Sequence, residues 1–170
     1  MIKRIKAYSF KKKKEKSLKK RDLSQRNTKL ETLAVLIDVN YVKDKSHIES
    51  IGAALKLDEN KVQFLYFDKT EKKAVPDSNK FSLNDFKWNG NVMNYRVKDF
   101  IENPVDVFIG VFSNQNELLN SVSAQSCARF KIGYLDADQE IFDLILNINP
   151  EDEKLFQSET IKFLKILNKI

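Results

Sequence analysis

The chain has 170 residues, which is enough for one domain with a hydrophobic core and too few for two ordinary domains. Hydrophobic residues make up 42% of the sequence and charged residues 32%, with only four glycines and three prolines, so the composition excludes collagenous and broadly disordered proteins. The net charge of +6 is unevenly distributed: residues 1–31 hold 13 Lys and Arg against 3 acidic residues (+10), whereas the other 139 residues hold 17 against 21 (−4). We therefore predict a basic arm at 1–31 and a slightly acidic domain at 32–170.

The arm is rich in lysine and contains two aromatic residues, Tyr8 and Phe10, within its basic stretch. A segment with so much charge and so few apolar residues is expected to be disordered when it is free in water. Each Lys or Arg that reaches a nucleic-acid phosphate releases counterions, and the two aromatic rings can stack on unpaired bases. Arg129 and Lys131 can add phosphate contacts from the domain. The predicted RNA-binding residues of the arm are Lys3, Arg4, Lys6, Tyr8, Phe10, Lys11, Lys12, Lys13, Lys14, Lys16, Lys19, Lys20, Arg21, Arg26 and Lys29.

The first half of the domain alternates between strand and helix patterns. Residues 32–38 are a continuous apolar run that closes on an aspartate, which is typical of a strand buried on both faces. Residues 46–49 match a capping box, which predicts the start of a helix. Residues 62–68 predict a second strand, again closing on an aspartate. Residues 69–91 predict a long connection whose aromatic segment, 81–88, packs on the domain.

The second half of the domain continues this alternation. Its predicted elements are a helix at 95–101, a strand at 105–112, a helix after the cap residues 114–117, strands at 130–135 and 141–146, and a last helix that opens at residues 149–150. Strands that alternate with helices form parallel sheets, because parallel strands need crossover connections. We therefore predict a small Rossmann-like three-layer α/β sandwich with a mostly parallel sheet and a basic N-terminal extension.

Four residues of the domain are candidates for catalytic or metal chemistry. Asp38 and Asp68 end predicted strands, where ligands bind in open α/β sheets, but no glycine-rich phosphate loop occurs and aspartates are common turn residues. His47 is the only histidine and Cys127 the only cysteine, so no metal-ligand set is complete. We expect His47 at the surface and Cys127 in a small buried apolar site. The sequence predicts no catalytic residue, no metal, no cofactor and no small-molecule ligand.

The sequence also indicates the cellular compartment of the protein. A single cysteine cannot form an internal disulfide, which fits a reducing compartment. No apolar run reaches the roughly 18 residues that a membrane-spanning helix needs, and no hydrophobic segment follows the basic N-terminus as in a secretory signal. We expect a cytoplasmic protein that does not contact membranes.

A resemblance to a known family rests on four segments: the basic arm, the strand Leu33 to Asp38, the strand Val105 to Ser113, and the junction Cys127 to Gly133. Over nearly its whole length, the chain resembles an uncharacterised family found in Bacteroidota that includes a lineage-specific protein of the large ribosomal subunit. The resemblance implies a structural, rRNA-binding component of the ribosome that is anchored by its arm, with neighbouring ribosomal proteins as further partners. It also implies that the α/β domain is an enzyme-like scaffold that lacks the chemistry of an active site.

Other interpretations stay open at this point. The arm can be a solvated tail without a specific partner, or it can contact an anionic membrane, although its apolar face is thin. The main alternative is a small Rossmann-like enzyme that processes sugars or nucleotides, with an incidental basic tail and a ligand near Asp38, Asp68 and Ser113. A third possibility is an interaction module that docks a protein partner through residues 81–88.

Overall fold

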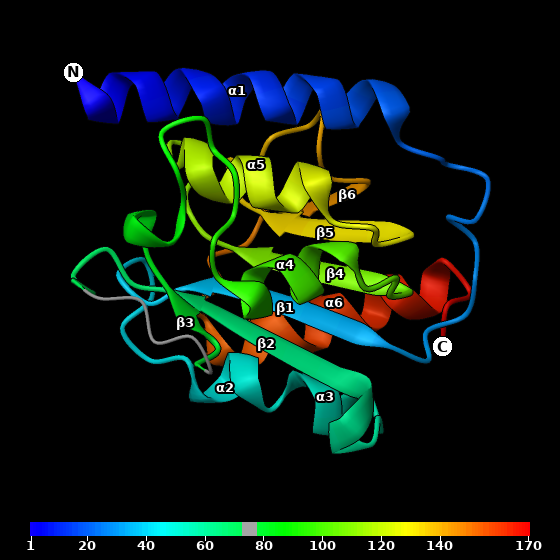
Figure 1. Ribbon diagram of the computed structural model, residues 1–170. Helices are drawn as coiled ribbons and strands as arrows, with labels where there is room; N and C mark the ends of the chain where they lie inside the picture. The colour runs from blue at the N-terminus through cyan, green and yellow to red at the C-terminus, as the bar shows by residue number, and fades with distance from the viewer. Residues whose placement is uncertain (73–77) are drawn as a thin grey trace.

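The structure is a computed structural model that describes residues 1–72 and 78–170 (Figure 1). Residues 73–77, which belong to the predicted connection at 69–91, lie outside the described residues. The elements in chain order are α1 (Ile2–Lys20), β1 (Leu33–Asp38), α2 (Ser46–Glu49), α3 (Ile51–Ala54), the 3-10 helix η1 (Glu59–Lys61), β2 (Val62–Phe67), β3 (Lys80–Phe81), the 3-10 helix η2 (Leu83–Asp85), α4 (Tyr95–Glu102), β4 (Val107–Val111), α5 (Glu117–Gln125), β5 (Phe130–Tyr134), β6 (Leu144–Leu146) and α6 (Glu153–Ile166).

The described residues form one sheet of six strands in the order β3-β2-β1-β4-β5-β6, and every neighbouring pair of strands is parallel. Strand β1 lies between β2 and β4, so the chain extends the sheet in one direction and then returns to extend it in the other, as in a Rossmann-like sheet. Strands β1, β4 and β5 are buried at every position, which explains why their sequences are mostly apolar and do not alternate with polar residues; the exceptions are Asp38 at the end of β1 and Lys131 in β5. The structure confirms the predicted fold class.

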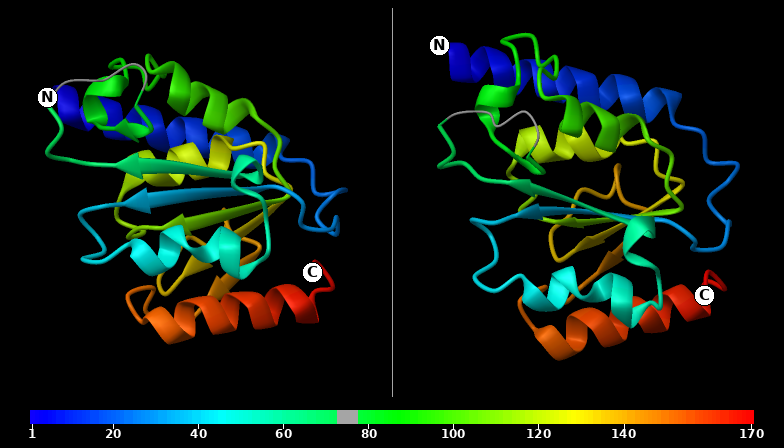
Figure 2. Two further views of the ribbon diagram at one scale, coloured as in Figure 1. Left: turned by 90° about the horizontal axis from the view of Figure 1, so that it is seen from below. Right: turned by 60° about the horizontal axis from the view of Figure 1, so that its bottom comes forward.

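Helices cover both faces of the sheet and enclose two hydrophobic cores. Helices α4 and α5 lie on one face, and α1 runs along the outside of α5 (Figure 1). Helices α2, α3 and α6 lie on the other face, where Figure 2 shows them side by side. The core between the sheet and α4 and α5 includes Phe10 of α1 together with Phe81 and Phe108, so the N-terminal helix contributes to the core of the domain.

Two strands differ from the sequence-based prediction. Strand β3 has only two residues, which pair with the end of β2, and such a short strand leaves no apolar alternation to detect. The last strand is also shorter than the predicted 141–146. Ile141 and Phe142 belong to a turn, because both of their backbone N–H groups donate to the carbonyl of Asp138, and only β6 pairs with β5.

Two helix starts also differ. The capping box predicted at 46–49 is wrong: the helix begins after Lys45, whose side chain makes no capping hydrogen bond, and the backbone N–H of Ser46 donates to the Asp44 carboxylate (2.9 Å). The Glu49 carboxylate instead accepts hydrogen bonds from Lys45 Nζ (2.6 Å) and from the Tyr66 hydroxyl (2.6 Å), which draws it away from the helix N-terminus. The last helix begins later than predicted, with Asp152 as its N-cap.

Candidate nucleic-acid interface

Residues 2–20 of the predicted arm form the continuous helix α1, so the expected disorder of the arm is wrong over these residues. Lysine is a good helix former, and neither glycine nor proline interrupts the segment. Lys19 and Lys20 lie in the last turn, where positive charge interacts favourably with the helix dipole. Local propensity therefore supports the helix, and contacts with the domain hold it in place.

One aromatic side chain anchors the middle of α1. Phe10 is 3% exposed and packs edge-on against Phe86, with ring centroids 5.3 Å apart. One turn earlier, Lys6 Nζ donates to the backbone carbonyls of Leu83 (3.0 Å) and Phe86 (2.7 Å). In this conformation Phe10 is part of the core and is inaccessible to bases, so its predicted stacking role is wrong for the folded protein.

Two ion pairs fix the C-terminal half of α1 and the residue that follows it. Lys14 Nζ lies 2.8 Å from an Asp138 carboxylate oxygen. Burial lowers the pKa of Lys14, but the hydrogen bond and the charge of Asp138 outweigh this effect and raise the pKa above its ordinary value. Arg21 contacts both carboxylate oxygens of Asp143, at 2.5 and 3.2 Å, and the Asp143 side chain is only 7% exposed. Such bidentate pairs are geometrically specific and hold the end of the helix in one position.

Several predicted RNA-binding cations therefore have partners inside the protein. Besides the three just described, Lys13 Nζ donates to Asn91 Oδ1 (2.8 Å), and Lys29 Nζ donates to Asn168 Oδ1 (2.8 Å). Burial, and secondarily the charge of Lys16, lowers the pKa of Lys13. The structure thus divides the predicted set into residues that dock the arm and residues that face solvent.

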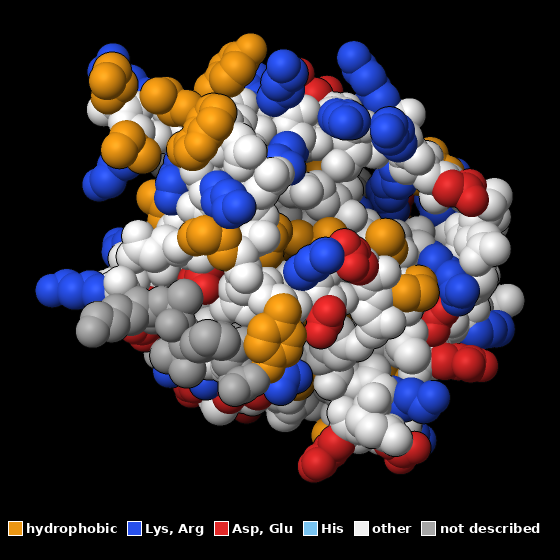
Figure 3. All heavy atoms as spheres, in the orientation of Figure 1, with side chains coloured by type: hydrophobic (Ala, Val, Ile, Leu, Met, Phe, Trp, Pro, Cys, Tyr) orange, Lys and Arg blue, Asp and Glu red, His pale blue; other side chains and the backbone are white. Residues whose placement is uncertain are grey.

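Most of the solvent-facing residues lie on the outer side of α1. Successive helical residues are rotated by about 100°, which places one group of side chains opposite Phe10. Figure 3 shows Lys and Arg side chains along the upper edge of the molecule, where α1 lies. The predicted residues that remain exposed are Lys3, Arg4, Tyr8, Lys11, Lys12, Lys16, Lys19, Lys20, Arg26 and Lys29, of which Lys29 donates to Asn168. We define the outer cationic face of α1 as Arg4, Lys11, Lys12, Lys16, Lys19 and Lys20.

A segment that the sequence-based set omits adjoins this helix. The Ser9 hydroxyl donates to the backbone carbonyl of Trp88 (3.3 Å), and the Trp88 side chain is 65% exposed. In the sequence Trp88 appears only as part of the aromatic segment 81–88, which is expected to pack on the domain or, in one interpretation, to dock a protein partner. The contact with α1 joins residues almost 80 positions apart, so no local pattern could have revealed it.

The two strand-end aspartates stabilise turns. The Asp38 carboxylate accepts a hydrogen bond from the backbone N–H of Asn40 (2.9 Å), and burial raises the pKa of Asp38. The Asp68 carboxylate accepts hydrogen bonds from the backbone N–H (2.9 Å) and the hydroxyl (2.7 Å) of Thr70, which lower its pKa. Both side chains hold the backbone that follows their strands.

The predictions for His47 and Cys127 are wrong. His47 is buried, and its Nε2 donates to the backbone carbonyl of Pro150 (2.6 Å), while its ring packs edge-on against Phe156. The histidine thus joins α2 to the segment before α6 rather than facing solvent. Cys127 is exposed rather than buried.

The two domain residues for which additional phosphate contacts were predicted, Arg129 and Lys131, both have partners inside the protein. Lys131 is fully buried on β5, and its Nζ donates to the carbonyl of Ser123 (2.6 Å) in the last turn of α5. Because its side chain is fully buried, Lys131 cannot contact a phosphate in this conformation. Burial and the nearby charge of Arg21 also lower the pKa of Lys131 to about 7. Arg129 pairs with the buried carboxylate of Asp106 at 2.6 Å.

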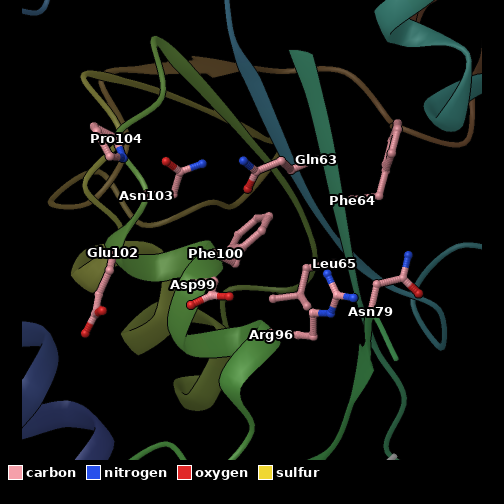
Figure 4. Close-up of a pocket in the computed structure, with 10 residues that line it drawn as sticks. All are labelled: Gln63, Phe64, Leu65, Asn79, Arg96, Asp99, Phe100, Glu102, Asn103 and Pro104. Atoms are coloured by element: carbon pink, nitrogen blue, oxygen red, sulfur yellow. The ribbon is translucent and has the colours of Figure 1, made fainter. Parts of the chain in front are cut away.

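Two hollows lie away from the outer cationic face. Figure 4 shows a groove of about 700 Å³ between α4 and the part of β2 that β3 does not reach, and its ten lining residues include neither histidine nor cysteine. The other hollow, of about 740 Å³, is lined mainly by the connection between β5 and β6 and contains Asp138 and Asp143, the partners of Lys14 and Arg21. Among residues 1–72 and 78–170, no cluster of three or more His, Cys, Asp or Glu side chains is placed to hold a metal ion.

In the part of the chain that the structure describes, no helix is long and apolar enough to cross a membrane.

Comparisons with known proteins identify the family of the chain. Neither the curated proteins nor the solved structures give a significant match to the sequence. A family model matches residues 6–167, which include most of α1 as well as the whole sheet. The chain therefore belongs to the DUF6913 family, a family of unknown function.

Proposed function

We propose that this protein is a cytoplasmic, structural component of the large ribosomal subunit, and that it binds ribosomal RNA with the outer cationic face of α1. The observation that carries the proposal is the exposure of six Lys and Arg side chains on one side of a docked helix. Glu15 is the one exposed acidic residue of that helix. A helix of 19 residues is about 28 Å long, so this face can contact several phosphates of one RNA segment.

Docking of the helix changes how the cations would bind. A disordered arm loses conformational freedom when it binds, and this loss weakens the complex. In α1 the backbone is already ordered, because Phe10 and the ion pairs of Lys14 and Arg21 hold it on the domain. Binding therefore needs to order only the side chains of the outer cationic face.

The affinity for RNA should fall steeply as the salt concentration rises. Each phosphate contact releases counterions and contributes about −0.7 to −0.9 to the slope of log K against log salt concentration. Six contacts should give a slope of about −4.2 to −5.4, which is a roughly 300- to 2,000-fold loss of affinity between 50 and 200 mM salt. This steep dependence would distinguish phosphate binding from an apolar contact.

The test compares two variants of the full chain that lose the same number of charges. The outer-face variant carries Lys12→Gln, Lys16→Gln, Lys19→Gln and Lys20→Gln. The control variant carries four changes at exposed positions away from α1, two of them on α6 at the opposite face of the sheet (Figure 2): Lys43→Gln, Lys61→Gln, Lys154→Gln and Lys165→Gln. Deleting α1 would be a poorer test, because it removes Phe10 from the core.

The readout is the fluorescence anisotropy of labelled large-subunit rRNA fragments at several salt concentrations. The outer-face variant should bind more weakly, with its salt slope reduced by about 3 to 4, because each lost phosphate contact lowers the slope by about 1. The control variant should keep the slope of the unmodified protein. Equal slopes for the two variants, or no binding by the unmodified protein at low salt, would contradict the proposal. Absence of binding would direct attention to nucleotide or sugar ligands near Asp38 and Ser113 instead.

A further inference from the structure

The N-terminal end of α1 and the loop after η2 form an exposed apolar surface beside the outer cationic face. Figure 3 shows hydrophobic side chains gathered at this end of α1, with Lys and Arg side chains among them. Trp88 and Tyr8 contribute the aromatic rings, with 65% and 67% of their surfaces exposed. A surface that exposes so much apolar area next to positive charge is typical of a binding site rather than of a solvated face. Its other exposed apolar members are Met1, Ile2, Ile5 and Met93.

The loop that carries Trp88 is anchored on both sides of the tryptophan. Phe86, two residues earlier, is 1% exposed and packs against Phe10 of α1. Gly90, two residues later, has φ of +76°, and a Cβ atom at this position would lie 3.2 Å from the Lys13 side chain. The backbone of this loop therefore fits closely against α1 through a turn that favours glycine. The loop is thus held in place on both sides of Trp88, while the Trp88 side chain itself is exposed.

The position of Trp88 relative to α1 links it to the cations. Its backbone carbonyl accepts the hydrogen bond from Ser9, the residue after Tyr8, so both aromatic residues belong to the same end of the helix. Arg4 and Lys11 lie about one turn before and after Tyr8 on α1, and Lys87 precedes Trp88 in the loop; all three are exposed. A polyanion whose phosphates contact these cations would bring its bases to the aromatic rings.

The chemistry of the rings selects among polyanions. Bases stack on tryptophan and tyrosine without a strong sequence preference, and each such contact changes affinity by roughly 5- to 150-fold. Bases inside a continuous duplex are already stacked on their neighbours, so only unpaired bases in loops, bulges or single strands can occupy such a ring. The positive charge around the rings favours RNA over an uncharged apolar partner.

We propose that Trp88 and Tyr8 stack on unpaired bases of the RNA that the outer cationic face binds. The preferred target is then an RNA with a single-stranded loop or bulge next to a helix, rather than a continuous duplex. This inference rests on the proposed function and adds the class of RNA to it.

Trp88 is the only tryptophan of the protein, so intrinsic fluorescence reports on this one ring. The full chain is titrated with two labelled RNAs that have equal numbers of phosphates, one a hairpin with a large unpaired loop and the other fully paired. The loop RNA should quench Trp88 fluorescence and bind more tightly, whereas the duplex should raise the anisotropy of its own label with little quenching. Trp88→Leu should weaken binding of the loop RNA by roughly 5- to 150-fold, and Trp88→Phe, which keeps an aromatic ring, should restore most of the affinity. Leu155→Ala, at an exposed apolar position on α6, serves as the control and should change neither quantity.

Three outcomes would overturn the inference, and they can be told apart. If both RNAs bind but Trp88 fluorescence and the affinity of Trp88→Leu stay unchanged, stacking is wrong and the proposed RNA-binding function stands. If neither RNA binds, the proposed function and the stacking both fail. If Trp88 fluorescence responds to vesicles of phosphatidylserine and phosphatidylcholine but not to the loop RNA, the surface is a membrane contact and the stacking is wrong.

Discussion

Replacing Phe10 with alanine tests whether α1 is a docked part of the domain. Phe10 is 3% exposed, belongs to the core that faces α4 and α5, and packs edge-on against Phe86. Truncating a buried phenylalanine costs about 3–5 kcal/mol, of which an edge-on aromatic pair accounts for about 1 kcal/mol. In urea titrations of the full chain, Phe10→Ala should therefore lower the free energy of unfolding by about 3 kcal/mol or more. If α1 detaches before the rest unfolds, the loss is limited to the free energy that holds α1 on the domain, and trypsin should cleave α1 faster than in the unmodified protein.

Tyr8→Ala is the matched control for this prediction. Tyr8 lies on the same helix two residues away and is 67% exposed, so its removal leaves no cavity. The free energy of unfolding of this variant should stay within about 0.5 kcal/mol of the original value. Equal and small effects of the two substitutions, together with equal trypsin cleavage of α1, would refute the conclusion that Phe10 anchors the helix.

Two further substitutions test the charged contacts. Arg21→Gln leaves the Asp143 carboxylate buried without its bidentate partner and should lower the free energy of unfolding by about 3–5 kcal/mol. Lys20→Gln, at the exposed neighbouring position, should change the free energy of unfolding little. Urea titrations of both variants measure the difference. Lys131→Met tests a pKa that burial lowers from 10.5 to about 7 in the folded protein. Between these pH values the unfolded chain binds more protons than the folded one, so Lys131 should make stability rise by about 2 kcal/mol from pH 7 to pH 9. Thermal unfolding over this range should show that rise in the unmodified protein relative to the variant, and identical pH profiles would show that Lys131 is not buried in the way described.

The sheet was predictable because its strands carry their own signature. The runs at 32–38, 105–112 and 130–135 are mostly apolar and do not alternate with polar residues, as is typical of strands buried on both faces, and each corresponds to a central strand of the sheet. Strand β3 was not predictable, since its two residues pair with β2 only because the chain returns to that edge. Parallel order and Rossmann-like topology followed from the alternation of strands with helices, which needs no knowledge of individual contacts.

The docking of α1 could not be predicted from its sequence. The side of the helix that faces the domain holds Lys6, Lys13 and Lys14 beside Phe10, so no apolar stripe marks it. These lysines are satisfied by carbonyl and carboxylate oxygens that lie 77 to 124 positions away in the chain. A lysine that pairs with the domain and a lysine that faces solvent look alike in the sequence, and only the fold separates them.

Single polar residues were the least predictable part of the site. His47 resembles a surface residue because it lies at the start of a helix, but the carbonyl of Pro150 from a distant segment satisfies its ring and allows its burial. Lys131 is buried for the same kind of reason, because the last turn of α5 supplies acceptors for its ammonium group. Such residues depend on partners that a local pattern does not contain.

Sedimentation of the protein with ribosomes tests the central claim most directly. Cell lysates containing the unmodified chain, the outer-face variant or the control variant are fractionated on sucrose gradients at low salt. We predict that the unmodified chain and the control variant migrate with large ribosomal subunits in stoichiometric amounts, while the outer-face variant stays near the top of the gradient. An unmodified chain that stays at the top, or an outer-face variant that migrates fully with large subunits, would contradict the claim that α1 anchors this protein to ribosomal RNA.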